Sequence, residues 1–378
     1  MYDIDIAWRR QVNQRLVGEP FVSVEAAIRG LCCVQAQDYY GASWALGLRT
    51  PGCTTQTIDR LMEQGAILRT HMMRPTWHFV LPEDIRWIQR LTASRVHAMN
   101  AGICRRVGVE KADRERATEL ISAALRGGRH MTRAEVASAL EEGGISTGGM
   151  RTVYYLMHAE LEQVICSGGR RGKEQTYALL DELAPADSGP VERKEAIVSL
   201  ADRYLQRHSP ATAQDFAWWS GLTVSDARAG FDAMGNKYLR RAINGKEYLL
   251  APEDEARGPS QCAVRLLPNF DESFVAYANR TAAVDPAIYK DRNHANVAFL
   301  GNVITIDGKV VGTWRRTVGR NEVQLQTMLL RGLTSQESAA LDAASERYAE
   351  FLGRPTTIAL VPDTAVTSPV HVDNSSAS

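Results

Sequence analysis

Long uncharged apolar stretches and C-x-x-C motifs are both missing from this sequence of 378 residues. The first absence argues against a membrane protein. The start, Met1 to Arg10, is polar, so we expect no secretory signal. The second absence argues against a zinc knuckle and fits reduced thiols in a cytoplasm, with free cysteine as small apolar filler. The six cysteines are Cys32, Cys33, Cys53, Cys104, Cys166 and Cys262.

A net charge is also absent, because 44 basic residues balance 44 acidic ones. That balance counts against a protein that coats nucleic acid by bulk attraction. Basic side chains nevertheless gather in three places, which we expect on turns and sheet edges. One short charge run is usually a solvated face, whereas three in such places favour phosphate contacts. The three are the segment Lys309 to Arg320, the glycine-rich turn with Arg170, Arg171 and Lys173, and the group Arg126, Arg129 and Arg133.

An internal repeat organises the first two thirds of the chain. Residues 57–84, 153–182 and 227–254 share one plan: a helix, a polar break, a short strand, a turn, and a second strand with an acidic stop. A helix followed by a hairpin is the rear half of a winged helix. Thr132 and Glu135 form a capping box that begins a helix in the second copy, and Gly143 with Gly144 ends it.

Further predicted helices supply the front halves of the three units. In the third unit, Ser225 is predicted to cap the helix that follows it. The helices predicted ahead of the copies are residues 24–34 and 40–48, then 117–125, then 193–206 and 213–220.

The length exceeds what one ordinary core supports, which predicts several structural units. We therefore expect an α+β protein with three tandem winged-helix units and a C-terminal β-rich, barrel-like domain. Asp307-Gly308 is predicted to make a tight hairpin turn in that domain. Its predicted strands are residues 263–267, 302–306, 310–314, 323–329 and 356–360, with one helix at 335–352. The expected bounds are 1–100, 101–190 and 191–258 for the winged-helix units, 259–360 for the β-domain, and 361–378 for a disordered tail.

The tripeptide Gln35-Ala36-Gln37 lies in the connector between the first two predicted helices. Side chains alternate along an extended chain, so we expect Gln35 and Gln37 to point the same way and Ala36 to face the core. Amides can hold a water or a substrate, but they cannot act as a general base at neutral pH. For the tripeptide alone, two solvent-facing glutamines are the simpler interpretation.

Taken with three other motifs, the tripeptide makes the chain resemble the AlkZ and YcaQ type of bacterial DNA glycosylases. The resemblance covers most of the sequence. The other motifs are RPTWHFV with Arg74, Thr76 and His78, LLPNFDESFVAY from Leu266 to Tyr277, and GKVVGTWRR from Gly308 to Arg316.

The resemblance implies a monofunctional DNA glycosylase of the AlkZ-like branch, with Gln35 and Gln37 as its catalytic motif. Family members remove alkylated purines, typically N7-alkylguanine, and some unhook interstrand crosslinks. It also implies that double-stranded damaged DNA is the partner, in the cytoplasm at the nucleoid, with no cofactor, no metal and no membrane. Three different wings in one chain suit a monomer that wraps one duplex.

The chemistry is consistent with this interpretation. An N7-alkylguanine is already cationic, so its glycosidic bond needs no strong acid. Two amide oxygens can steady the developing oxocarbenium sugar and aim a water at C1′. Positioning of this kind can lower a barrier by about 7 kcal/mol or more when the orientation is ideal. Uncharged bases, whose departure requires protonation, should not be released.

The resemblance and the basic runs also suggest residues that contact DNA or the lesion. For His78, we weigh contact with DNA evenly against a partner at a sheet edge. Only one of the adjacent Arg315 and Arg316 should touch DNA, because neighbours on a strand face opposite ways. The candidates are Arg74, Thr76, His78, Arg170, Arg171, Lys173, Arg315 and Arg316.

Aromatic residues and one acid add further candidates. Trp77 and Trp314 could stack on exposed bases. For Trp218 and Trp219 we favour the core. Asp271 could be a carboxylate near the cleft, but it more often caps a turn.

Two other functions stay open at this point. Winged helices mostly bind DNA without cutting it, so the chain could be a transcriptional regulator. A metal-dependent hydrolase using His71, His78 and Asp38 is the weaker alternative, because their spacing matches no recognised ligand pattern.

Overall fold

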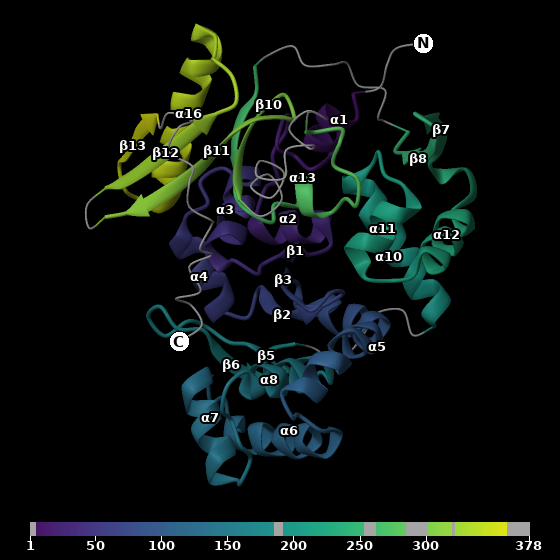
Figure 1. The fold of residues 1–378 in the computed structure, drawn as a ribbon, viewed down its shortest axis with the longest axis vertical. Helices are drawn as coiled ribbons and strands as arrows, with labels where there is room; N and C mark the ends of the chain where they lie inside the picture. Colours follow the sequence, from purple (N-terminus) through teal and green to yellow (C-terminus); the bar gives the residue numbers. More distant parts are fainter. Residues whose placement is uncertain (1–4, 185–191, 253–261, 285–300, 320–321, 361–378) are drawn as a thin grey trace.

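A computed structural model describes residues 5–184, 192–252, 262–284, 301–319 and 322–360. The first winged-helix unit lies at the centre of the molecule, and the other three parts surround it (Figure 1). The second unit lies below it, the third to one side, and the C-terminal β-domain to the other. Among the described helices, none combines the length and apolar composition of a membrane span. All six cysteines are free, and five are buried.

The first unit contains five helices and three strands. Ser23 caps α2 and Asp38 caps α3, each by accepting a backbone N–H. The long helix α5 begins at a proline and leads into the second unit. The bounds are α1 Ile6–Asn13, α2 Val24–Leu31, β1 Val34–Gln35, α3 Tyr39–Arg49, α4 Thr55–Glu63, β2 Leu68–Met72, β3 Thr76–Val80 and α5 Pro82–Arg106.

The second unit follows the predicted order. The capping box of Thr132 and Glu135 is present, and Gly143 ends the helix as predicted. Its bounds are α6 Lys111–Leu125, β4 Met131–Thr132, α7 Arg133–Glu142, α8 Arg151–Leu161, β5 Ile165–Ser167, β6 Thr176–Leu179 and α9 Leu180–Leu183.

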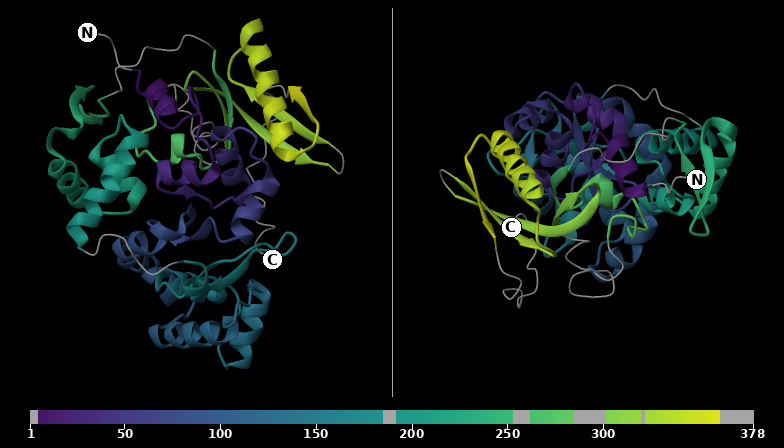
Figure 2. Two further views of the ribbon diagram at one scale, coloured as in Figure 1. Left: turned by 180° about the vertical axis from the view of Figure 1, so that it is seen from behind. Right: turned by 90° about the horizontal axis from the view of Figure 1, so that it is seen from above.

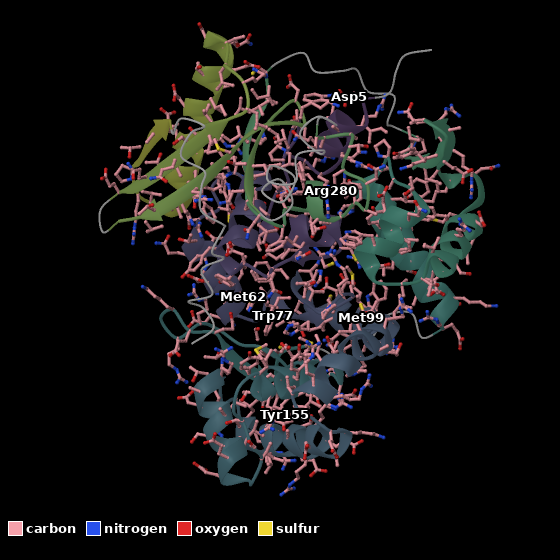
Figure 3. The ribbon with its side chains drawn as sticks, viewed as in Figure 1. Asp5, Met62, Trp77, Met99, Tyr155 and Arg280 are labelled. Carbon is pink, nitrogen blue, oxygen red and sulfur yellow. The ribbon has the colours of Figure 1, made fainter. Side chains whose placement is uncertain are left out.

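The hairpins of the first two units join in one sheet. Its six strands run in the order β1-β3-β2-β5-β6-β4, and Arg69 of β2 pairs with Ser167 of β5 across the boundary. The first unit therefore has a continuous sheet in common with the second, which fixes the two wings relative to each other. Trp77 lies near this boundary (Figure 3), with its ring centroid 6.3 Å from that of Tyr177.

The third unit ends in a separate two-stranded sheet. Thr223, rather than the predicted Ser225, caps α12, because Thr223 forms a reciprocal capping box with Asp226 and Ser225 already lies inside the helix. The bounds are α10 Arg193–His208, α11 Ala213–Ser220, α12 Val224–Ala233, a 3₁₀ turn Gly235–Lys237, β7 Leu239–Ile243 and β8 Lys246–Leu250.

The C-terminal sheet runs in the order β13-β12-β11-β10-β9, with β13 parallel to β12. Helix α16 contacts both edge strands, β9 and β13, so the sheet curls around it (Figure 2). Asp307 and Gly308 have φ values of 49° and 83°, as a two-residue hairpin turn requires. The bounds are β9 Val264–Leu267, α13 Glu272–Val275, β10 Asn302–Ile306, β11 Lys309–Val318, β12 Val323–Leu329, α16 Ser335–Leu352 and β13 Thr356–Leu360. The predicted disordered tail, 361–378, lies outside the described residues.

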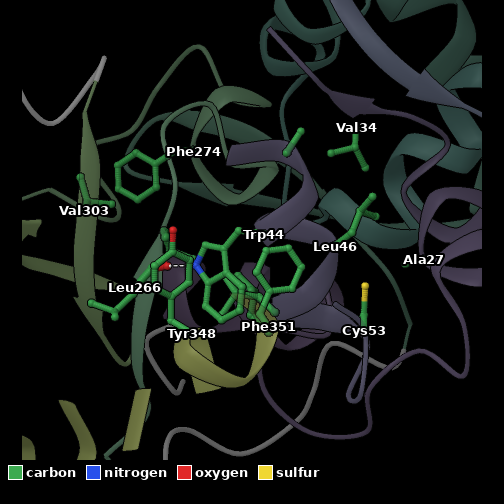
Figure 4. Close-up of a cluster of buried hydrophobic side chains, with 14 of the residues drawn as sticks. Ala27, Val34, Trp44, Leu46, Cys53, Leu266, Phe274, Val303, Tyr348 and Phe351 are labelled. Carbon is green, nitrogen blue, oxygen red and sulfur yellow. Dashed lines mark hydrogen bonds between the residues drawn. The ribbon is translucent and has the colours of Figure 1, made fainter. Parts of the chain in front are cut away.

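One apolar core is common to the first unit and the β-domain. Trp44 of α3 packs edge-on against Tyr348 and lies near Phe351, both from α16 (Figure 4). Its indole Nε1 donates to the Leu266 carbonyl at 2.7 Å. These contacts hold the β-domain against the helix that follows the tripeptide.

Candidate active site around Gln35-Ala36-Gln37

The tripeptide is fixed to the edge of the six-stranded sheet. Gln35 of β1 pairs with His78 of β3, and the Ala36 N–H donates to the Trp77 carbonyl at 2.7 Å. The carbonyl of Ala36 is held as well, because Arg69 donates to it from Nε and Nη2 at 3.1 and 2.9 Å. Because every one of these bonds goes to a sheet residue, the backbone that carries the two amides is held rigidly.

The two amides differ in accessibility. Gln35 is only 4% exposed, and its Oε1 accepts a hydrogen bond from Arg74 Nη2 at 2.6 Å. Gln37 is exposed, and its Oε1 accepts from the Trp77 N–H at 3.3 Å. Ala36 is fully buried in the core, as the alternation predicts. Gln37 is therefore the more accessible of the two amides, and the Gln35 oxygen is occupied by Arg74.

His78 is fully buried, which favours the alternative of a partner within the sheet over contact with DNA. Its Nδ1 lies 3.0 Å from the Thr76 carbonyl, and its Nε2 has no hydrogen-bond partner. Burial, together with nearby Arg74, lowers the pKa of His78 to about 3, so the ring is neutral. Arg74 and Thr76 are half-buried next to it. Burial also lowers the pKa of Arg74.

A buried carboxylate, Glu272, lies directly behind the tripeptide. Its Oε1 accepts the Gln35 N–H at 2.7 Å, and its Oε2 accepts Trp219 Nε1 at 3.0 Å. His208 Nε2 lies 3.5 Å from the same Oε2. Burial alone would raise the pKa of Glu272, but His208 and the Gln35 N–H together lower it. The carboxylate is therefore ionised behind strand β1, which carries Gln35 and leads into Gln37.

Glu272 was not among the residues that the sequence suggested, whereas its neighbour Asp271 was. Asp271 caps α13 by accepting the Ser273 N–H, and it forms a buried ion pair with Arg49 at 2.8 Å. It therefore has the capping role and does not face the tripeptide. The available signal was the motif NFDES, in which an acid follows a capping acid, but burial of Glu272 depends on contacts with the third unit.

Two basic side chains from different parts of the chain converge on Tyr40, three residues after Gln37. Arg170, from the second wing, donates from Nη2 to the Tyr40 hydroxyl at 2.9 Å. Arg316, from β11, has its guanidinium 5.6 Å from the Tyr40 ring centroid and donates to the Tyr348 hydroxyl. Arg315 is exposed, whereas Arg316 is half-buried, which agrees with the expectation that the two face opposite ways.

The other basic candidates of the second wing lie further out. Arg171 is exposed and forms an ion pair with Glu135 at 2.6 Å, and it also donates to the His130 carbonyl. Lys173 is exposed at the end of the hairpin. These two residues therefore flank the convergence at Tyr40 rather than join it.

The tryptophans divide differently from the prediction. Trp314 is buried and donates from Nε1 to the Leu267 carbonyl, so it is a core residue and does not stack on bases. Trp219 is buried as expected, but Trp218 is 45% exposed, contrary to the prediction. The Arg74 guanidinium lies 5.5 Å from the Trp218 ring centroid. Trp77 is half-buried, with the Arg69 guanidinium 4.1 Å from its ring centroid.

The three residues of the weaker metal hypothesis do not form a ligand group in the ranges that the structure describes. His71 pairs with buried Glu160, His78 faces Thr76, and Asp38 accepts the N–H groups of Tyr40 and Gly41. Each side chain is thus engaged with a different partner.

Comparisons with known proteins point in one direction. The model of a family described as DNA glycosylase AlkZ-like matches residues 28–351. A relative from Streptomyces sahachiroi, named interstrand DNA cross-link repair glycosylase, is 26% identical over 322 residues, which span 82% of this chain and 86% of the relative. The solved structure of Streptomyces sahachiroi DNA glycosylase AlkZ has the same fold, with a TM-score of 0.76 at 22% identity, covering 94% of this chain and 98% of that one.

Proposed function

The chain belongs to the AlkZ-like DNA glycosylase family, and on that premise we propose that it hydrolyses the N-glycosidic bond of cationic alkylpurines, such as N7-alkylguanine, in duplex DNA. As a glycosylase it is an enzyme acting on damaged DNA, which argues against the non-catalytic regulator. The name of the curated relative supports extending the proposal to bulky adducts and interstrand crosslinks.

One observation carries the proposal: an exposed amide, Gln37, lies two residues after strand β1 and is hydrogen-bonded to strand β3, with an ionised carboxylate behind β1. A cationic purine leaves with the electron pair of its C1′–N9 bond and becomes neutral, so no protein acid is needed. Positive charge develops on the sugar at the same time. Amide oxygens and the buried charge of Glu272 favour that charge in a site of low polarity.

In this mechanism Gln37 accepts a hydrogen bond from the attacking water and aims its oxygen at C1′. The oxygen forms the new bond to C1′, and the surplus proton passes to bulk water because an amide does not hold it at neutral pH. Gln35 contributes its carbonyl dipole once DNA has drawn Arg74 away from it. Arg74 then serves a phosphate or the lesion, next to the exposed ring of Trp218.

The remaining candidates bind the duplex in this proposal. Arg170 and Arg316, which both lie at Tyr40, contact phosphates next to the lesion, and Arg171 and Lys173 contact phosphates further along, whereas Arg315 faces the other way from Arg316 and makes no contact. Thr76, at the start of β3, lines the path by which DNA would approach β1 and β3. The three winged-helix units end near residues 100, 190 and 258. In this proposal they bind one duplex together, and the chain acts as a monomer.

The test measures free N7-methylguanine released from methylated duplex DNA in the presence of a chelator. We expect release above the no-enzyme control, and we expect Gln37→Ala to remove most of it while circular dichroism shows an intact fold. Because loss of correct positioning of the water can cost about a hundredfold in rate, we expect Gln37→Ala to be slower by about that factor or more. A yield equal to the control, on both methylated and bulky-adduct duplexes, would refute the proposal.

A further inference from the structure

Helices α5 and α8 pack against each other on the side of the second unit, through a small cluster of apolar residues. Val96 of α5 is buried against Met157 and Leu161 of α8. Asn100 donates from Nδ2 to Met157 Sδ at 2.8 Å. This packing fixes the register of the two helices, so the residues adjacent to Val96 and Met157, which are His97 and His158, lie side by side.

Three potential metal ligands meet at this helix pair. His97 Nε2 lies 2.9 Å from Glu162 Oε1, and His158 Nδ1 lies 3.9 Å from the same oxygen. All three donor atoms lie within 4.8 Å of one another, and the two imidazole centroids are 5.2 Å apart. His158 and Glu162 are four residues apart at the end of α8, so both project to the same side.

The second imidazole is the feature that a plain surface hydrogen bond does not explain. A His97–Glu162 hydrogen bond alone would need no further ring. His158 nevertheless turns its Nδ1 into the same space, where that atom is buried and has no hydrogen-bond partner. A buried, unpaired imidazole nitrogen carries a cost that a bound cation removes.

We propose that His97, His158 and Glu162 bind a divalent transition-metal ion of the zinc class, with water in the fourth position. Two imidazole nitrogens and one carboxylate oxygen form a ligand set that Zn²⁺ accepts. Bonds of about 2.1 Å in a tetrahedral site place ligand atoms about 3.4 Å apart. The distances of 2.9 and 3.9 Å bracket that value, and the half-exposed side chains of Glu162 and His97 can close the remaining gap.

Such an ion would brace the first winged-helix unit against the second. Helix α5 belongs to the first unit, helix α8 to the second, and both helices also contact strand β2 of the common sheet. The role is structural and independent of the glutamine pair.

The experiment uses the untagged full chain after chelator treatment and titrates Zn²⁺ against a chromophoric chelator. We expect one equivalent to bind, and Co²⁺ substitution to give the visible absorption of a four-coordinate site. Loss of an outer-shell partner already weakens metal sites 10- to 100-fold, so His97→Ala and Glu162→Gln should each weaken binding by about a hundredfold or more. Zn²⁺ should also raise the midpoint of thermal unfolding of the unmodified chain but of neither variant.

His130→Ala is the matched control, since it removes a histidine that is not part of the group. It should leave affinity and stoichiometry unchanged. Glu162→Gln keeps volume at a half-exposed position, so it tests the ligand without endangering the fold. Equal Zn²⁺ affinity in the unmodified chain and both ligand variants would overturn the proposal, as would loss of binding in His130→Ala.

Discussion

Replacing Glu272 by glutamine separates its electrostatic role from its shape, because the two side chains have nearly the same volume. The carboxylate accepts two N–H groups, from Gln35 and from the Trp219 indole, and lies 3.5 Å from His208 Nε2. A glutamine has one acceptor oxygen and would turn its NH₂ group toward one of these donors. At least one buried N–H is then left without an acceptor.

The expected cost in stability follows from that count. A buried donor left unsatisfied costs about 1 to 3 kcal/mol, and a hydrogen bond to a charged group contributes about 1.5 to 3 kcal/mol. We therefore expect Glu272→Gln to lower the free energy of unfolding by about 3 kcal/mol. The rate should fall as well, by about a hundredfold, because a preorganised group that stabilises developing charge is worth that much in other enzymes.

The assay is single-turnover release of N7-methylguanine, performed at a temperature where near-ultraviolet circular dichroism shows the variant to be folded. Asp271→Asn is the matched control. It removes the adjacent buried carboxylate and leaves the buried Arg49 guanidinium without a counter-charge, which costs about 3 to 5 kcal/mol, but it leaves the tripeptide untouched. A folded Glu272→Gln protein with an unchanged single-turnover rate would refute the electrostatic role.

Two other predictions concern DNA binding and pH. Arg316→Ala should weaken binding to all duplexes alike, and in a fluorescence anisotropy titration it should reduce by about 1 the slope of log binding constant against log salt concentration. The control Arg116→Ala on α6 should change neither quantity. An unchanged slope for Arg316→Ala would mean that Arg316 contacts no phosphate. The pKa of His78 is lowered from 6.5 to about 3, chiefly by burial, so the unfolded chain takes up a proton that the folded chain does not. The free energy of unfolding that depends on neutral His78 is therefore fully present above pH 6.5 and falls toward pH 3 by about 1.4 kcal/mol per pH unit. Urea unfolding at pH 7 and pH 5 should show a smaller slope for His78→Asn than for the unmodified chain.

Local signals in the sequence were sufficient for most elements. The capping box at Thr132 and the Asp307-Gly308 turn need only neighbouring residues to form, and both are present as predicted. Amphipathic periodicity likewise located α16, which has the predicted bounds of 335–352. The error at Ser225 is also local, since Thr223 competes for the same cap and has Asp226 as its reciprocal partner.

Features that depend on distant residues were not predictable in this way. Strand β2 pairs with β5, nearly a hundred residues later, and no periodicity in either strand reports that partner. Trp218 and Trp219 are adjacent and chemically identical, yet one lies near Arg74 while the other donates to Glu272, because α11 turns only one of them inward. Burial of a charged side chain such as Glu272 requires donors from elsewhere in the chain, so composition argues against it.

In the proposed mechanism, one hydrogen bond, between Arg74 and Gln35, keeps the glutamine pair incomplete until DNA binds. In the free protein this bond occupies the Gln35 oxygen with a guanidinium, whose positive charge has the same sign as the sugar cation that hydrolysis would form. Hydrolysis therefore requires Arg74 to move, and a DNA phosphate is the partner with the charge to attract it. Binding of the duplex would then expose the second amide and remove an opposing charge in the same step. Under the proposed mechanism the chemistry proceeds only after DNA is in place, so the motif is inactive until a duplex has docked.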